Sequence, residues 1–292
     1  MNTTLTSRLR LTGLLILLTL IAAFPSVLPA ETPPSSILSS QPLAHDRALP
    51  SATSYLKNIR EGRQIEASNS PARASVSPDL FIGASLGTAW PIESGYVVTN
   101  NHVIADSTNV LLVDSFGQKF RAWTVARDEV NDIALLEVYD RGKLPPALPL
   151  SDLQAGLGAS VFTIGFPRID IMGKTPKLSN GIISSANGLR DDPMTYQTTV
   201  PIQPGNSGGP LLNMRGEVVG MIKSMIGIRE ETGGPVLTLQ NTSCALKVDP
   251  IKQLMGFLPQ KETVIDVLPR SSENLELLAL RIQDSVLIVV AR

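Results

Sequence analysis

Between about residues 80 and 240, short runs of β-branched and other apolar residues alternate with turns rich in Gly, Asn, Asp and Pro. Strand-length runs at this spacing are typical of barrels and sandwiches. A helical period of 3.6 residues is not sustained anywhere between Phe81 and Gln240. The pattern therefore predicts an all-β domain. Its strand-like runs lie at residues 96–99, 110–113, 122–125, 133–138, 161–164, 218–222 and 235–240.

The pattern changes near the C-terminal end. Asp249-Pro250 is a plausible helix cap followed by a first-turn proline. Between residues 273 and 283 leucines recur at near-helical spacing, and a strand-like run follows at 286–290. One helix and one strand are too little for an independent domain. We therefore expect an all-β domain over residues 76–258 with a short helix and strand extension over 259–292.

The N-terminal 30 residues have the layout of a secretory signal peptide. Arg8 and Arg10 precede an apolar run over residues 11–24, and Leu28-Pro29-Ala30 forms a small-residue cleavage site. The apolar run is shorter than the roughly 20 residues that span a bilayer. We expect a periplasmic or secreted protein. The alternative is an uncleaved anchor, in which case membrane contact is confined to this segment.

Residues 31–75 are dominated by Ser, Pro and Ala. Such a composition buries too little apolar surface to offset the entropy of ordering the chain. This segment is therefore expected to be a flexible tether between the signal peptide, residues 1–30, and the all-β domain.

Composition restricts the chemistry further. Lys and Arg number 25 against 26 Asp and Glu, so no excess of positive charge is available for phosphates, which disfavours a nucleic-acid partner. The chain has one cysteine, Cys244, and two histidines, His45 and His102. One cysteine cannot form an intrachain disulfide, and thiolate metal sites need several. We expect no metal and no cofactor. Because His45 lies in the tether, histidine chemistry depends on His102.

The strongest local signal is Pro204-Gly205-Asn206-Ser207-Gly208-Gly209-Pro210. Glycines beside a serine permit positive φ and a close backbone approach. The alternative is a glycine-rich hairpin loop with an incidental serine. The segment also fits the Gly-x-Ser-x-Gly elbow of α/β-hydrolases, but that elbow needs a following helix and a histidine later in the chain. No histidine follows Ser207, so the α/β-hydrolase interpretation fails.

A serine hydroxyl becomes a good nucleophile only when a base takes its proton, and that base needs an orienting carboxylate. His102 follows a strand-like run and is the candidate base for Ser207. Asp132 stands immediately before an apolar strand, where it would be buried at a barrel edge. Asp128 is the second candidate for the carboxylate and Asp106 the third. The order His102, Asp132, Ser207 is the predicted catalytic triad.

These residues and their neighbours resemble the trypsin-like serine proteases and, within them, the HtrA/Deg family. The resemblance covers about residues 82–257 and implies a chymotrypsin/trypsin-like double six-stranded β-barrel with the triad between the barrels. It implies an oxyanion hole formed by the Gly205 and Ser207 N–H groups, with Asn206 shaping the loop. The matching segments are Gly87-Thr88-Ala89-Trp90, residues 99–104, residues 132–136, residues 204–213 and residues 216–220.

The same resemblance implies a serine endopeptidase that forms an acyl-enzyme on polypeptide substrates. Pro201, six residues before Ser207, would lie at the base of the first specificity pocket, next to Val200 and Ile202. Because nothing acidic is available there, we expect cleavage after small or aliphatic residues. The strand that pairs with the substrate backbone would contribute Met221, Ile222, Lys223 and Ser224.

The chain also departs from the family pattern. Members usually carry PDZ domains after the protease domain, whereas the residues after Phe257 are too few for one. Trp90 is bulkier than the phenylalanine usual at its position. Cys244 replaces a usual aromatic, and is either a small buried hydrophobe or part of a pocket.

Assembly and biological role are expected from resemblance alone. It implies a homotrimer built by N-terminal contacts that include Phe81 and Ile82, and a role in protein quality control. The alternative from a different class is a proteolytically silent, protease-like module that binds extended peptides.

Overall fold

The computed structural model describes residues 76–93, 95–105, 107, 109–228, 237–259, 266–272 and 274–292, without side chains at 224–228 and 237–241. The predicted signal peptide and tether lie outside these residues and stay predictions. Within the described ranges, no helix is both long and apolar enough to cross a membrane.

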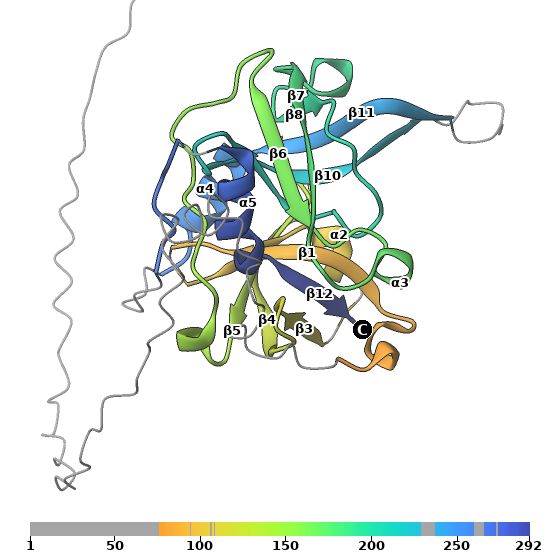
Figure 1. The fold of residues 1–292 in the computed structure, drawn as a ribbon, viewed down its shortest axis with the longest axis vertical. Coiled ribbons are helices and arrows are strands. Elements are labelled where there is room, and N and C mark those ends of the chain that lie inside the picture. Colours follow the sequence, from red (N-terminus) through yellow and green to blue (C-terminus); the bar gives the residue numbers. More distant parts are fainter. Residues whose placement is uncertain are drawn as a thin grey trace, which may run out of the picture. The chain divides into compact units, whose positions relative to one another are not determined.

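The first barrel is closed by six antiparallel strands in the order β1-β12-β3-β4-β5-β2 (Figure 1). Its interior is filled by side chains that alternate along the strands, among them Val97, Leu112, Leu136 and Val289, all fully buried. The strands are β1 (Ser85–Pro91), β2 (Val97–Thr99), β3 (Val110–Val113), β4 (Lys119–Asp128), β5 (Ile133–Val138) and β12 (Leu287–Ala291).

The second barrel is closed in the order β10-β11-β8-β7-β6-β9. Its interior contains Val161, Tyr196, Leu211 and Ile222, each at most 1% exposed. The strands are β6 (Ser160–Gly165), β7 (Lys177–Ser185), β8 (Thr195–Thr198), β9 (Pro210–Asn213), β10 (Val218–Ile228) and β11 (Leu237–Lys247). The two closed barrels confirm the predicted all-β, double six-stranded architecture.

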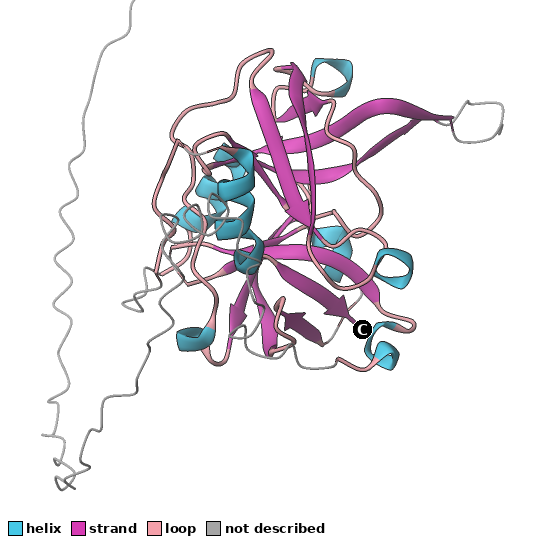
Figure 2. Cartoon of the chain, viewed as in Figure 1, coloured by secondary structure: helices cyan, strands magenta, loops and turns pink. Residues whose placement is uncertain are grey.

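Helices are few and short among the described residues (Figure 2). The longest two are amphipathic and pack against the barrels: Ile251 of α4 and Leu278 of α5 are buried in one apolar cluster with Trp90 and Phe162. That cluster draws on both barrels and so joins them. The helices are α2 (Asn101–Ile104), α3 (Ile169–Met172), α4 (Val248–Gly256) and α5 (Leu275–Ile282), with 3-10 turns η2 (Pro78–Phe81), η3 (Arg141–Lys143), η4 (Leu189–Asp191) and η5 (Gln283–Ser285).

The C-terminal strand β12 is one of the six strands that form the first barrel, where it pairs with β1 on one side and with β3 on the other. Val289 is paired with Gly87 on one side and with Leu112 on the other. All five residues of β12 are buried. The expected helix and strand after residue 258 are both present, and the strand belongs to the first barrel. A fully apolar strand gains most when buried on both faces, and here it fills the place that closes the barrel.

Arg292 fastens the end of β12. Its backbone exchanges two hydrogen bonds with Asn109, and its guanidinium donates to the carbonyls of Asp79, Leu80 and Ile82 around η2. The side chain of Ile82, an expected trimer contact, is 70% exposed, and Phe81 is half-buried.

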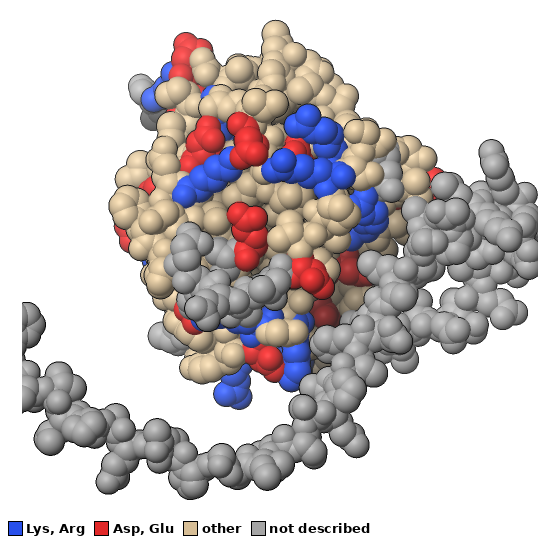
Figure 3. Space-filling view, turned by 90° about the vertical axis from the view of Figure 1, so that its left-hand side faces the viewer, with Lys and Arg blue, Asp and Glu red and all other residues tan. Residues whose placement is uncertain are grey.

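A buried carboxylate lies in the turn between β9 and β10. Glu217 is 3% exposed and accepts hydrogen bonds from Asn213 at 2.8 Å and Arg215 at 2.6 Å, and it pairs with Arg270 at 3.0 Å. Burial alone would raise the pKa of Glu217, but these donors and charges outweigh it and hold the pKa below its usual value. Arg270 also reaches Asp152, which pairs with Lys252. Acidic and basic side chains are likewise interspersed on the face shown in Figure 3.

Candidate active site

His102 and Asp132 come from the first barrel and Ser207 from the second. His102 is in the short helix α2 after β2, Asp132 immediately precedes β5, and Ser207 lies in the loop between β8 and β9. The pairing of β2 with β5, Thr99 opposite Ala134, brings the histidine and the aspartate together.

Asp132 is bound to His102 through both carboxylate oxygens. Oδ2 lies 2.7 Å from the ring Nδ1, and Oδ1 accepts the His102 backbone N–H at 2.8 Å. Because an ionised carboxylate only accepts, the ring proton is placed on Nδ1 and Nε2 is left as the basic nitrogen. The imidazole side chain is half exposed, whereas the Asp132 side chain is 13% exposed. The pair thus has a shielded carboxylate and an accessible base.

The backbone of Asp132 is fixed as well. Its carbonyl accepts the Asn101 N–H at 3.2 Å and the Asn100 side-chain amide at 2.9 Å, and its φ is +62°. Asp is one of the few non-glycine residues that tolerate this left-handed region. Asp128, the second candidate, instead binds Asn131 through both oxygens. Asp106, the third, lies outside the described residues.

The loop that carries Ser207 has every carbonyl from Pro204 to Gly209 hydrogen-bonded. In order, the donors are the Arg168 N–H, the Thr88 hydroxyl, the Gly209 N–H, the Thr88 N–H, the Trp90 indole and the Ile222 N–H, at 2.7–3.1 Å. Gly205 and Gly208 have φ of +100° and +82°, and a Cβ on either would approach a carbonyl oxygen to 2.4 or 2.3 Å. These glycines are therefore required by both conformation and space.

The N–H groups of this loop divide into two sets. Those of Asn206, Gly208 and Gly209 donate to carbonyls of Gln203, Ile222 and Asn206. Within the described part of the chain, the N–H groups of Gly205 and Ser207 have no acceptor. These are the two donors expected to form an oxyanion hole. Asn206, expected to shape the loop, is 3% exposed and its side-chain Oδ1 has no described partner.

The Ser207 hydroxyl donates to the Lys223 carbonyl at 3.2 Å. No hydrogen bond between Ser207 and His102 is found among the described residues. To donate to His102, the hydroxyl proton has to leave the Lys223 carbonyl. A hydroxyl hydrogen turns about a single bond, so this change of acceptor needs no backbone movement.

The residues expected to bind the substrate differ in how exposed they are. Pro201 is exposed, whereas its neighbours Val200 and Ile202 are buried in the apolar cluster of the second barrel. The side chains of Met221 and Ile222 are fully buried. The backbone of Ile222 is already bonded to Gly208 and Gly209, so β10 is free to pair with a substrate only from Lys223 onward.

That part of β10 is irregular. The pairing with β11 slips between Ile222 and Ser224, so the half-buried Lys223 is outside the ladder. Ser224 is paired with Cys244 in register, and its side chain is not described. Cys244 is 9% exposed, and burial raises the pKa of its thiol. This placement is that of the small buried hydrophobe, the first of the two interpretations from sequence.

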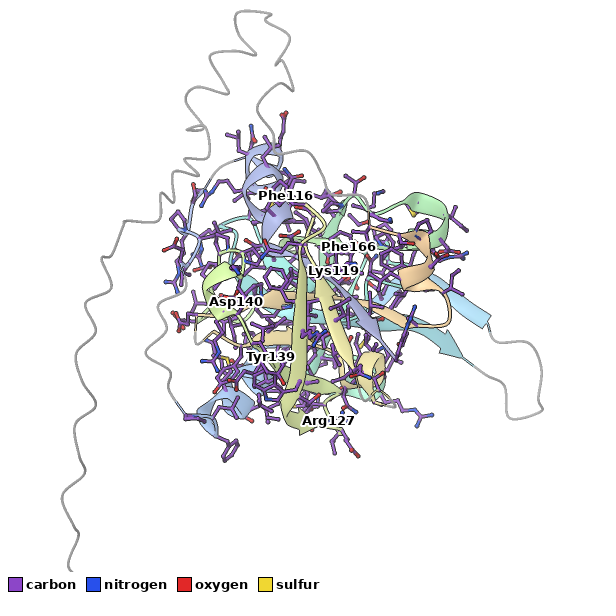
Figure 4. All side chains as sticks on the ribbon, turned by 90° about the horizontal axis from the view of Figure 1, so that it is seen from below. Phe116, Lys119, Arg127, Tyr139, Asp140 and Phe166 are labelled. Atoms are coloured by element: carbon purple, nitrogen blue, oxygen red, sulfur yellow. The ribbon has the colours of Figure 1, made fainter. Side chains whose placement is uncertain are left out.

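Two surface hollows lie away from these residues. One, of about 370 Å³, is on the first barrel, where Figure 4 shows Lys119, Tyr139 and Asp140. The other, of about 690 Å³, is formed by α4 and the segment 267–270. Neither is lined by His102, Asp132 or Ser207, so neither is the site of the predicted chemistry.

The part of the chain that carries this constellation is similar to known peptidases. Residues 87–221 match the family model described as a trypsin-like peptidase domain, and this range includes His102, Asp132 and Ser207. Residues 87–221 are thus similar to a trypsin-like peptidase domain, and this part of the chain shows homology to DegP/HtrA serine endoproteases.

Two curated relatives carry that homology. The chain is 43% identical over 143 residues to a probable periplasmic serine endoprotease, DegP-like, of Pseudomonas putida, covering 47% of this chain and 28% of the relative. It is 36% identical over 192 residues to the putative serine protease HhoA of Synechocystis, covering 62% of this chain and 45% of the relative. The chain therefore spans less than half the length of either relative.

Among solved structures, the serine endoprotease from Yersinia pestis is similar at 24% identity and a TM-score of 0.47. The match covers 63% of this chain and 66% of that one.

Proposed function

We propose that the protein is a serine endopeptidase that cleaves polypeptides through an acyl-enzyme intermediate. One observation carries the proposal: Ser207 lies in a loop whose carbonyls are all bonded while two N–H groups beside the hydroxyl have no described acceptor. Such preorganised donors stabilise the charge that develops on a carbonyl oxygen during acyl transfer. The bonded pair of His102 and Asp132 supplies the base.

In the proposed reaction the Ser207 hydroxyl turns from the Lys223 carbonyl toward His102. Nε2 takes its proton while Oγ attacks the scissile carbonyl. The resulting oxyanion accepts hydrogen bonds from the Gly205 and Ser207 N–H groups. His102 then gives the proton to the leaving amine, and a water molecule deprotonated by the same nitrogen hydrolyses the acyl-enzyme.

Asp132 acts through His102 in both halves of the reaction. Its ionised carboxylate keeps the Nδ1 tautomer and stabilises the imidazolium that forms when Nε2 is protonated.

The proposed substrates are extended polypeptides cut after small or aliphatic residues. Support comes from the sequence before the nucleophile loop, where Val200, Pro201 and Ile202 offer no acidic side chain to a Lys or Arg of the substrate. A peptide-library cleavage profile, with Ser207→Ala as the blank, tests this preference. Preferred cleavage after Lys or Arg would contradict it.

The proposed location and role are periplasmic protein quality control, in keeping with the N-terminal sequence and the names of the relatives. Faster cleavage of an unfolded protein than of its folded form is the expected outcome. Equal cleavage of both forms would count against this role.

The alternative, a silent module that binds extended peptides, draws on one contact. The Ser207 hydroxyl is engaged by the Lys223 carbonyl and not by His102. Labelling with a fluorophosphonate probe separates the two functions, because only an activated serine reacts readily. Covalent labelling of the wild type and none of Ser207→Ala is expected. An unlabelled, folded wild type would leave the silent module as the better description.

A further inference from the structure

We propose that Thr88 and Trp90, two side chains on β1 of the first barrel, are positioning residues for the nucleophile loop of the second barrel. They hold its carbonyls so that the Gly205 and Ser207 N–H groups stay directed at the reacting carbonyl. The inference rests on the proposed function for its effect on catalysis, but the positioning itself can be measured without any activity.

Thr88 contacts the loop through both its backbone and its side chain. Its N–H donates to the Ser207 carbonyl at 2.9 Å, and its hydroxyl donates to the Gly205 carbonyl at 2.7 Å. The same hydroxyl oxygen accepts the Phe166 N–H at 3.1 Å, so it both donates and accepts. The Thr88 carbonyl in turn accepts the Thr99 hydroxyl at 2.9 Å, which fixes β1 to β2. Thr88 is thus a fully bonded connection between the two barrels.

Trp90 reaches the next part of the same loop. Its indole Nε1 donates to the Gly208 carbonyl at 3.1 Å, while its ring is fully buried in the cluster that joins the barrels. A phenylalanine would retain most of the packing and lose the donor. The indole N–H therefore has a function separable from the bulk of the ring.

The hydrogen bonds within the loop, from Asn206 to Gln203 and from Gly209 to Asn206, leave the Gly205 carbonyl to Thr88. Gly205 rotates freely compared with other residues, since it has no Cβ. The two oxyanion donors belong to the peptides before Gly205 and before Ser207, and the Gly205–Asn206 peptide links them. Each peptide is planar, so fixing the Gly205 carbonyl by Thr88 fixes this linking peptide. The Ser207 and Gly208 carbonyls are held in the same way just beyond it.

No space is left for another group to replace the Thr88 hydroxyl. Thr88 is fully buried, and a Cβ placed on Gly165 would lie 2.8 Å from its Oγ1. A Cβ on Gly208 would lie 2.3 Å from the Thr88 carbonyl oxygen. Removing the hydroxyl would leave the Gly205 carbonyl and the Phe166 N–H buried without that partner, which is costly.

The test compares three variants. Thr88→Val removes the hydroxyl at constant shape, Thr88→Ser keeps the hydroxyl, and Trp90→Phe removes only the indole donor. For Thr88→Val we expect kcat to fall about 10-fold or more with KM within about two-fold, since loss of a whole oxyanion donor costs roughly 100- to 1,000-fold. Thr88→Ser should restore most of kcat. Trp90→Phe should lose less than Thr88→Val.

A second readout does not depend on catalysis. Hydrogen exchange resolved by NMR should be faster at the Asn206, Gly208 and Gly209 amides in Thr88→Val, and unchanged at Leu135 in the core of the first barrel. Wild-type kcat together with wild-type exchange in folded Thr88→Val would overturn the proposal. If Thr88→Val does not fold, Trp90→Phe is judged by the same two measurements.

The two proposals fail differently. An inactive wild type with loop exchange that depends on Thr88 would refute the peptidase and keep the positioning role. If the wild type is active but Thr88→Val has the same kcat and the same loop exchange, the positioning role is refuted and the peptidase is kept.

Discussion

Asp132 binds His102 twice, through the ring Nδ1 at 2.7 Å and through the backbone N–H at 2.8 Å. The ring contact sets the tautomer and the backbone contact sets the position of α2. One carboxylate therefore fixes both the direction and the location of the base.

Replacing Asp132 with Asn should lower kcat by about 10,000-fold, because an amide favours the wrong imidazole tautomer. The backbone contact survives through the amide oxygen, so the fold should be kept. Steady-state kinetics and circular dichroism check the two statements. The matched control is Asp128→Asn, whose carboxylate accepts hydrogen bonds from Asn131 and whose loss should leave kcat near wild type. A larger effect at Asp128 would reassign the orienting carboxylate.

The β12 strand should contribute to stability as part of the barrel core. Leu287→Ala removes a fully buried side chain and is expected to lower the free energy of unfolding by about 2–5 kcal/mol. Leu157→Ala, the same substitution at a side chain that is 76% exposed, should change it by less than about 0.5 kcal/mol. Chemical denaturation measures both. Similar small losses at the two positions would mean that β12 is dispensable.

Stability in acid should depend on Glu217. Its pKa is lowered in the folded protein, so its contribution is complete above the unfolded value near 4.3 and is lost as the pH falls through the lower folded value. The wild type should therefore lose stability more steeply below about pH 4.3 than Glu217→Gln does. Melting temperatures between pH 3 and pH 7 test this, with the exposed Glu129→Gln as control. Parallel curves for the wild type and Glu217→Gln would contradict it.

Cys244 should be inert in the native protein. The thiolate is the reactive form, and burial raises the pKa of this thiol. Because the chain has one cysteine, mass spectrometry after treatment with iodoacetamide reports on this residue alone. One adduct is expected in denaturant and almost none in its absence. Rapid native labelling would instead place Cys244 on an accessible pocket.

The three candidate residues could be chosen from the sequence because each lies in a short, distinctive segment. Among the strands that lie outside the predicted strand-like runs, β7 and β8 contain Lys, Ser, Asn, Thr and Gln. About half of β7 also faces solvent, so no apolar run marks these two strands in the sequence. The place of β12 was missed for another reason. Its apolar run predicts a strand, but its partners β1 and β3 are distant in the chain. A local sequence pattern does not indicate which distant strands will pair. The Thr88 hydroxyl and the carbonyl that it holds are also far apart in the chain, by 117 residues.

The position of β12 also bears on the order of folding. His102, Asp132 and Ser207 all precede residues 287–291 in the chain, and without these residues β1 and β3 lack the strand between them. Such non-local closure is slow compared with local contacts. Because β1 carries Thr88 and Trp90 and pairs with β12, we expect the proposed fastening of the nucleophile loop to be complete only after β12 has closed the barrel.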